Sequence, residues 1–128
     1  AASDVYKRQE QDRIFQAMAD RYHFKAIARH VRYTHSSSEN SLKAYLYYNG
    51  QTYESKLFRF QILDRVGGGD SFASGLIYGL MTTENAEMAV NYGAAHGALA
   101  MTTPGDTTMA SKKEVEAIMG GAGARVQR

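Results

Sequence analysis

Three consecutive glycines, at positions 67, 68 and 69, constrain this sequence more than any other feature. Apolar and aromatic residues lead into them, and Asp70 follows at the start of a segment with helical periodicity. Such a junction presents backbone N–H groups, with no side chains in the way, at the positive end of a helix dipole. It suits a phosphate or another oxyanion, and an aspartate beside it is placed to accept a proton from a hydroxyl group.

Two common phosphate-binding motifs do not fit this segment. No Lys-Ser or Lys-Thr pair follows the glycines, so it is not a P-loop, and Phe72 breaks the dinucleotide-binding spacing G-x-G-x-x-G. The glycines alone fit equally well a strand–helix turn in which Asp70 serves only as an N-cap.

The hydrophobic pattern predicts an α/β order of elements. We expect helices over residues 10–22, 70–81, 84–101 and 112–119, and strands over 24–31, 42–48 and 52–60. Asn49-Gly50 predicts a two-residue hairpin turn, residues 34–41 a polar loop, and Pro104-Gly105 a turn. Glycines in the two middle helices predict close approach of another element. We expect part of that partner surface to lie outside the chain, which would leave it marginally stable.

Composition narrows the function classes. The 128 residues suffice for one domain, and the absence of cysteine excludes disulfides, thiolate metal sites and a Cys nucleophile. The 15 basic and 13 acidic residues form no block of like charge, so we expect no nucleic-acid partner and no membrane association. The four histidines lack metal-ligand spacing, and the tyrosines of the predicted hairpin are ordinary strand aromatics.

Residues 1–9 fit no pattern that follows and are similar to a translated sequencing-adapter string. We expect them to be a non-native leader, with an ordinary disordered terminus as the alternative. Residues 10–128 then form a single unit. No signal-peptide core is present, so we expect a cytoplasmic location.

The glycine segment resembles the C-terminal signature of the PfkB (ribokinase-like) carbohydrate kinases. The stretch most like bacterial 2-keto-3-deoxygluconate kinases is Asp-Arg-Val-Gly-Gly-Gly-Asp at 64–70, supported by Gly-Leu-Ile-Tyr-Gly-Leu at 75–80, Pro-Gly-Asp at 104–106 and Arg-Val-Gln-Arg at 125–128. The resemblance implies the C-terminal portion of a three-layer α/β/α domain and an ATP-dependent kinase acting on a sugar acid.

The resemblance also implies roles for individual residues. Asp70 matches the general base that takes the proton from the attacking sugar hydroxyl. Gly67, Gly68 and Gly69 match the anion hole for the transferred phosphate, with Mg²⁺ on the nucleotide. The implied partners are a small sugar acid and a nucleotide, with a homo-oligomer as the implied state of the full-length enzyme.

The resemblance implies a role for three further positions, and for two of them a simpler structural explanation is also open. Asp64 and the Val66 carbonyl match a monovalent-cation site, typically for K⁺, but Asp64 fits loop capping equally well. Asp106 resembles a sugar-hydroxyl contact, and aspartate is also at home in a Pro-Gly-Asp turn.

The chain departs from the family in three respects, one of which is Arg65 in place of the usual Thr. It has no glycine between His30 and Leu42, where many relatives have a nucleotide loop, although Arg32, His35 and Ser36 loosely resemble the ketodeoxygluconate-kinase version. It also lacks the segment that carries most of the sugar pocket, so the sequence predicts a truncated kinase that is weak or inactive. The alternatives are a fructokinase or ribokinase type and a non-catalytic remnant.

Overall fold

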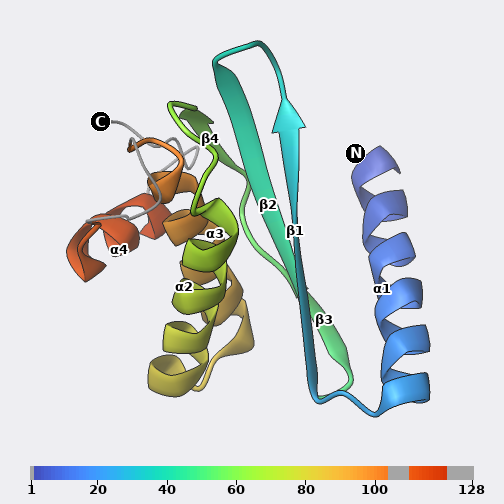
Figure 1. Ribbon diagram of the computed structural model, residues 1–128. Helices are drawn as coiled ribbons and strands as arrows, with labels where there is room; N and C mark the ends of the chain where they lie inside the picture. Colours follow the sequence, from blue (N-terminus) through green and yellow to red (C-terminus); the bar gives the residue numbers. More distant parts are fainter. Residues whose placement is uncertain (1, 104–109, 121–128) are drawn as a thin grey trace.

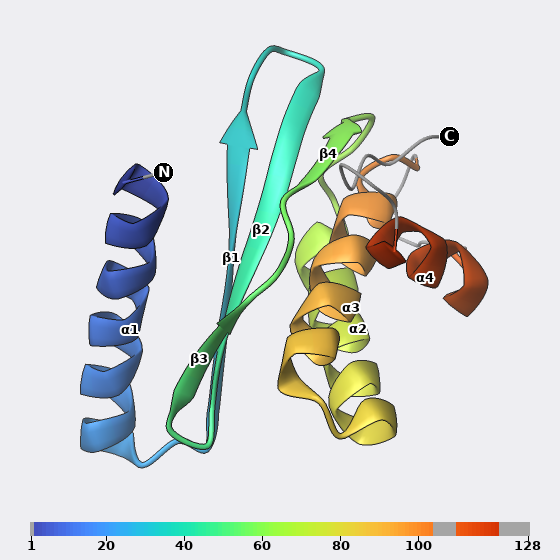
Figure 2. The same cartoon turned by 180° about the vertical axis from the view of Figure 1, so that it is seen from behind.

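The computed structural model describes residues 2–103 and 110–120, with side chains from Arg8 onward. In chain order the elements are α1 (Ala2–Tyr22), β1 (Ala26–Thr34), β2 (Glu39–Tyr48), β3 (Gln51–Glu54), β4 (Phe58–Gln61), α2 (Gly68–Thr83), α3 (Ala86–Ala100) and α4 (Lys112–Gly120). An antiparallel sheet lies between α1 on one face and α2 with α3 on the other, while α4 packs on α3 (Figures 1 and 2). The predicted layered α/β class is confirmed.

Strand β2 forms the centre of the sheet. It pairs along one edge with β1, and along the other with β3 and β4 in succession. Successive strand residues point to opposite faces, so Tyr45 and Tyr47 meet Phe15 of α1 whereas Leu42, Ala44 and Leu46 enter the core shared with α2 and α3. The tyrosines are therefore ordinary strand aromatics, as the sequence indicates.

The first helix is longer than its periodicity predicts. It begins at Ala2 rather than at residue 10, so residues 2–9 continue a regular helix and are not a disordered terminus. Gln11, Phe15 and Ala19 are buried at helical spacing, which fixes the face that packs on the sheet. The non-native origin of residues 1–9 stays a prediction.

The predicted Asn-Gly hairpin is confirmed. Asn49 and Gly50 both have positive φ, 51° and 88°, and they join β2 directly to β3. The prediction of one strand over residues 52–60 is wrong, because the chain leaves the ladder after Glu54. The Ser55 hydroxyl accepts a hydrogen bond from the Ala44 N–H at 2.9 Å, and Asn91 Oδ1 accepts one from the Lys56 N–H at 2.9 Å. The Ser55 N–H also donates to the Ala44 carbonyl at 2.9 Å, and these contacts hold the connection that precedes β4 at Phe58.

The glycines of α2 and α3 bring the two helices together. A Cβ added at Gly75 would lie 2.7 Å from the Tyr92 carbonyl oxygen, and one at Gly79 would lie 2.6 Å from the Ala89 Cα. Gly93 and Gly97 perform the same role from α3, where they face Phe72 and Gly68. Each glycine-bearing helix is thus the close partner that the other requires, and that partner lies within the chain.

Candidate active site

The glycine loop is anchored at the C-terminal end of α3. The N–H groups of Leu63 and Asp64 donate to the same Met101 carbonyl, at 2.9 and 3.2 Å. Asp64 Oδ1 in turn accepts a hydrogen bond from the Val66 N–H at 3.0 Å. The loop-capping role considered for Asp64 is therefore present in the structure.

The three glycines meet different local demands. Gly67 is the N-cap of α2 with φ 88° and ψ −7°, a left-handed conformation that residues other than glycine rarely adopt. Because glycine has no side chain, no side chain at this position caps the helix. Gly68 is buried, and a Cβ there would lie 3.1 Å from the Met101 side chain. A Cβ at Gly69 would meet nothing within 4 Å. The open space at Gly69 leaves the backbone accessible to a ligand.

Asp70 lies in the first turn of α2 and is exposed. The next two residues, Ser71 and Phe72, are buried at 6% exposure each, so they fix the orientation of the turn. The structure thus places an accessible carboxylate beside the N-terminal amides of a 16-residue helix, where a developing negative charge is stabilised. This arrangement fits phosphate binding next to a general base. Asp70 is not the N-cap of α2, because Gly67 occupies that position.

Strand β1 places His30 beside this turn. His30 lies against Phe72 with ring centroids 4.9 Å apart, and its buried Nδ1 makes no hydrogen bond. Burial lowers the pKa of His30, and the Arg32 charge lowers it further. His30 and Arg32 pair with Ala44 and Leu42, so both point to the α2 side of the sheet.

The other two residues of the loosely matching loop have structural roles. His35 Nε2 lies 2.6 Å from the Ser41 hydroxyl, and the Ser36 hydroxyl accepts a hydrogen bond from the Glu39 N–H at 3.0 Å. Both contacts close the β1–β2 turn. Arg32 is therefore the member of the three that faces the helical layer containing the glycine loop.

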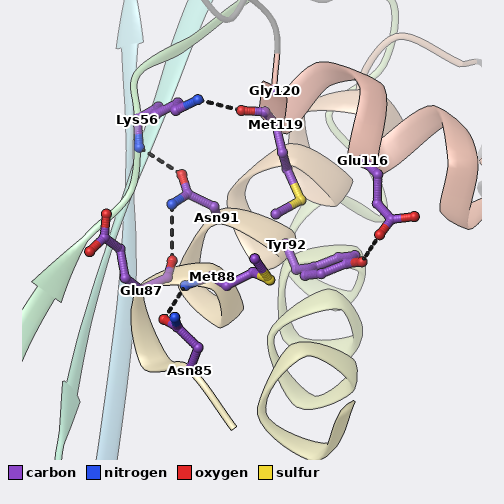
Figure 3. A pocket seen from close by; sticks show the side chains of 9 residues that line it. All are labelled: Lys56, Asn85, Glu87, Met88, Asn91, Tyr92, Glu116, Met119 and Gly120. Atoms are coloured by element: carbon purple, nitrogen blue, oxygen red, sulfur yellow. Dashed lines mark hydrogen bonds between the residues drawn. The ribbon is translucent and has the colours of Figure 1, made fainter. Parts of the chain in front are cut away.

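A hollow of about 460 Å³ lies between α3, α4 and the β3–β4 connection (Figure 3). It includes Asn85 at the N-terminal end of α3, whereas the glycine loop is anchored at the other end, about 22 Å away along a 15-residue helix. Its polar groups bond to one another: Asn91 bridges the Lys56 N–H and the Glu87 carbonyl, and the Tyr92 hydroxyl donates to Glu116 at 2.5 Å. These contacts hold α3, α4 and the connection together, and the sequence pattern did not reveal them.

Within the described ranges, no group of three or more His, Asp or Glu residues could hold a metal ion. In the same part of the chain, no helix is long and apolar enough to cross a membrane. The predicted sugar contact Asp106 and the Pro104-Gly105 turn lie outside the described residues.

A layered α/β unit with a glycine loop opening a helix defines the structural class, and comparisons with known proteins define the family. The family model described as pfkB family carbohydrate kinase matches residues 14–113. The chain belongs to this family.

Two solved structures resemble this chain closely. The 2-dehydro-3-deoxygluconokinase of Thermotoga maritima superposes with a TM-score of 0.84 at 32% identity, over 89% of this chain and 35% of that one. A putative 2-keto-3-deoxygluconate kinase from Enterococcus faecalis gives a TM-score of 0.75 at 31% identity, over 84% of this chain and 31% of that one.

Among curated proteins, the chain is 35% identical over 81 residues to the 2-dehydro-3-deoxygalactonokinase of Haloferax volcanii. This match spans 63% of the chain and 26% of the relative. A 5-dehydro-2-deoxygluconokinase from Listeria monocytogenes is 31% identical over 71 residues, which are 55% of this chain and 22% of that protein. The chain therefore spans a minor part of the length of the relatives it matches.

Proposed function

We propose that this chain supplies the phosphoryl-transfer end of an ATP-dependent sugar kinase that phosphorylates a hydroxyl group of 2-keto-3-deoxygluconate. The observation that carries the proposal is the exposed Asp70 beside the open glycine N-terminus of α2. Family membership supports the reaction class, and the names of the two solved neighbours support the sugar acid.

Asp70 acts as the general base. It accepts the proton of the sugar hydroxyl as the hydroxyl oxygen forms its bond to the γ-phosphorus of ATP and the bond to the ADP oxygen breaks. A base of this kind contributes about 10²- to 10⁴-fold to the rate. The carboxylate of Asp70 is exposed and so can reach a bound substrate.

The proposed anion hole for the transferring phosphoryl group comprises the amides of residues 67–69 and of Asp70, of which the Gly68 N–H donates to the Arg65 carbonyl at 3.3 Å in the structure. Phosphoryl transfer depends mainly on positioning the phosphoryl group and on neutralising its charge. The N–H groups of a helix N-terminus can do both where no side chains block the approach. The open space at Gly69 fits close approach of a phosphate oxygen. Mg²⁺, when bound with ATP, neutralises phosphate charge.

Asp64 and the Val66 carbonyl form the proposed K⁺ site. Carboxylate and carbonyl oxygens are the ligands that hard cations prefer, which supports this proposal, whereas the hydrogen bond from the Val66 N–H to Asp64 Oδ1 is the loop-capping contact described above. Asp106 is the proposed sugar-hydroxyl contact, and Arg32 is a proposed contact for nucleotide phosphate. We further propose a cytoplasmic location and a homo-oligomeric enzyme.

A substrate panel tests the proposed sugar. The product of the complete reading frame is assayed for ADP release with 2-keto-3-deoxygluconate, the substrates named for the two curated relatives, fructose and ribose. The highest kcat/KM should belong to 2-keto-3-deoxygluconate. Preference for a relative's keto-deoxy sugar acid would move the enzyme within the family, whereas preference for fructose or ribose would overturn the sugar-acid assignment. The absence of ADP release with every sugar would favour the non-catalytic alternative.

A further inference from the structure

Phe72 is the first large side chain that α2 buries after the glycine loop. Residues 67–69 have no side chains, and Asp70 is exposed, so none of them fixes the first turn by side-chain packing. Phe72 is 6% exposed, and Ser71 beside it is equally buried. Because the Phe72 ring is much the larger of the two side chains, its position sets how the first turn of α2 is rotated about the helix axis.

Two elements hold the Phe72 ring. On α3, a Cβ added at Gly93 would lie 2.9 Å from Phe72 Cδ1, and one at Gly97 would lie 3.4 Å from Phe72 Cβ, so both glycines leave space for this side chain. On β1, the His30 ring lies 4.9 Å from the Phe72 ring between centroids, with 32° between the two planes. This distance is typical of a packed ring pair. Loss of the His30 ring would therefore leave Phe72 unsupported on the β1 side.

The contact between His30 and Phe72 is a packing contact. Within the described part of the chain, the buried Nδ1 of His30 makes no hydrogen bond. Burial lowers the pKa of His30, and the charge of Arg32 lowers it further, so the imidazole is uncharged at neutral pH. An uncharged imidazole packs on Phe72 as a flat aromatic ring, and a phenyl ring at this position would do the same.

We infer that His30 is a positioning residue for the first turn of α2: it holds Phe72 and thereby directs the Asp70 carboxylate. Phe72 follows Asp70 by two residues, so about 200° of rotation about the helix axis separates their side chains. A rotation of the turn that moves Phe72 into the space left by His30 therefore moves the carboxylate in the opposite direction. The inference rests on the proposed function, in which Asp70 is the base.

The first test measures turnover in the product of the complete reading frame. His30→Ala should lower kcat by about 10- to 100-fold with little change in the KM for the sugar, because a small misplacement of the base slows the chemical step. His30→Phe restores a flat ring and should recover most of the wild-type kcat. His30→Leu fills the space without a flat ring, so it tests the contact if His30→Ala does not fold, and its kcat should lie between the other two.

Val31→Ala is the matched control. Val31 is the next residue of β1, and it packs against the cluster on the α1 side of the sheet, away from Phe72. The substitution removes packing from the same strand without touching the first turn of α2. It should therefore retain the wild-type kcat even where it lowers Tm.

The second test does not depend on catalysis. The Ser71 N–H donates to the Gly67 carbonyl at 2.9 Å, within the turn that Phe72 fixes. In this chain, hydrogen exchange at the Ser71 amide should be about tenfold faster in His30→Ala than in the wild type, because the turn opens locally more often. The exchange rate should be unchanged in His30→Phe and in Val31→Ala.

Three results would overturn the inference: a kcat of His30→Ala close to that of Val31→Ala, a His30→Phe variant as slow as His30→Ala, or a Ser71 amide that exchanges at the wild-type rate in His30→Ala. Failure of the proposed function gives a different result. A complete product without turnover, together with faster exchange at Ser71 in His30→Ala, would overturn the kinase proposal and support the role of His30 in holding the turn.

Discussion

Gly79 lies where α2 and α3 approach most closely, and Gly79→Ala tests that packing. The new Cβ would lie 2.6 Å from the Ala89 Cα and 3.0 Å from the Ala89 Cβ. Carbon atoms in favourable contact are about 3.5–4.0 Å apart, so the helices must separate locally by about 1 Å. Ala89 is fully buried and the nearer atom is backbone, which means that no side-chain rotation relieves the clash.

The expected magnitude follows from two opposing effects. Overpacking a well-packed core typically costs about 1–3 kcal/mol, and a backbone contact belongs at the upper end of that range. Alanine favours a helix interior over glycine by about 1 kcal/mol. The variant should therefore lose about 2 kcal/mol of unfolding free energy, equivalent to a decrease of about 8 °C in Tm for a chain of this length.

Urea unfolding followed by circular dichroism measures this loss. Gly69→Ala is the matched control, since it makes the same change in the same helix where a Cβ meets nothing within 4 Å. The control should be as stable as the wild type or up to about 1 kcal/mol more stable. A Gly79→Ala variant no less stable than the Gly69→Ala variant would refute the close approach of α2 and α3.

Three further predictions concern the loop, two half-buried histidines and the buried Tyr92. Gly67→Ala should cost about 1–2 kcal/mol of unfolding free energy in urea denaturation, because φ at this position is 88°. Burial lowers the folded-state pKa values of His30 and His96 below 6.5. At a pH just below 6.5 the unfolded chain therefore binds more protons than the folded chain. The free energy of unfolding should therefore decrease as pH falls below 6.5, and the combination of His30→Gln with His96→Gln should flatten this dependence. Burial and the hydrogen bond to Glu116 raise the pKa of Tyr92 to about 12, so stability should decrease as pH rises above 10 in the wild type but less so in Tyr92→Phe. The Phe variant should also lose about 1 kcal/mol at neutral pH, and an unchanged urea midpoint would contradict this.

Local signals in the sequence predicted much of the fold. The Asn49-Gly50 turn depends on the conformational freedom of two residues, and the helices depend on periodicity within each segment. The break after Glu54 could not be predicted in this way, because it depends on Ser55 bonding to Ala44 and on Asn91 bonding to Lys56. The last of these contacts joins residues 35 positions apart.

In the candidate site, too, some features follow from the local sequence and others depend on tertiary packing. Consecutive glycines before an aspartate predict a bare helix N-terminus, and the structure places Gly67 and Asp70 accordingly. The anchoring of the loop on the Met101 carbonyl depends on how α3 packs against the sheet, so no local pattern reveals it. The contact between His30 and Phe72 likewise depends on strand register and helix placement together.

The most direct test of the account is the turnover of Asp70→Asn in the product of the complete reading frame. Asp20→Asn, which alters an exposed carboxylate on α1, is the matched control. We predict that Asp70→Asn lowers kcat by about 10²- to 10⁴-fold with the Kd for ATP and the Tm nearly unchanged, while the control retains full activity. A kcat for Asp70→Asn close to that of the wild type would contradict the assignment of Asp70 as the base, and with it the central claim about the glycine loop.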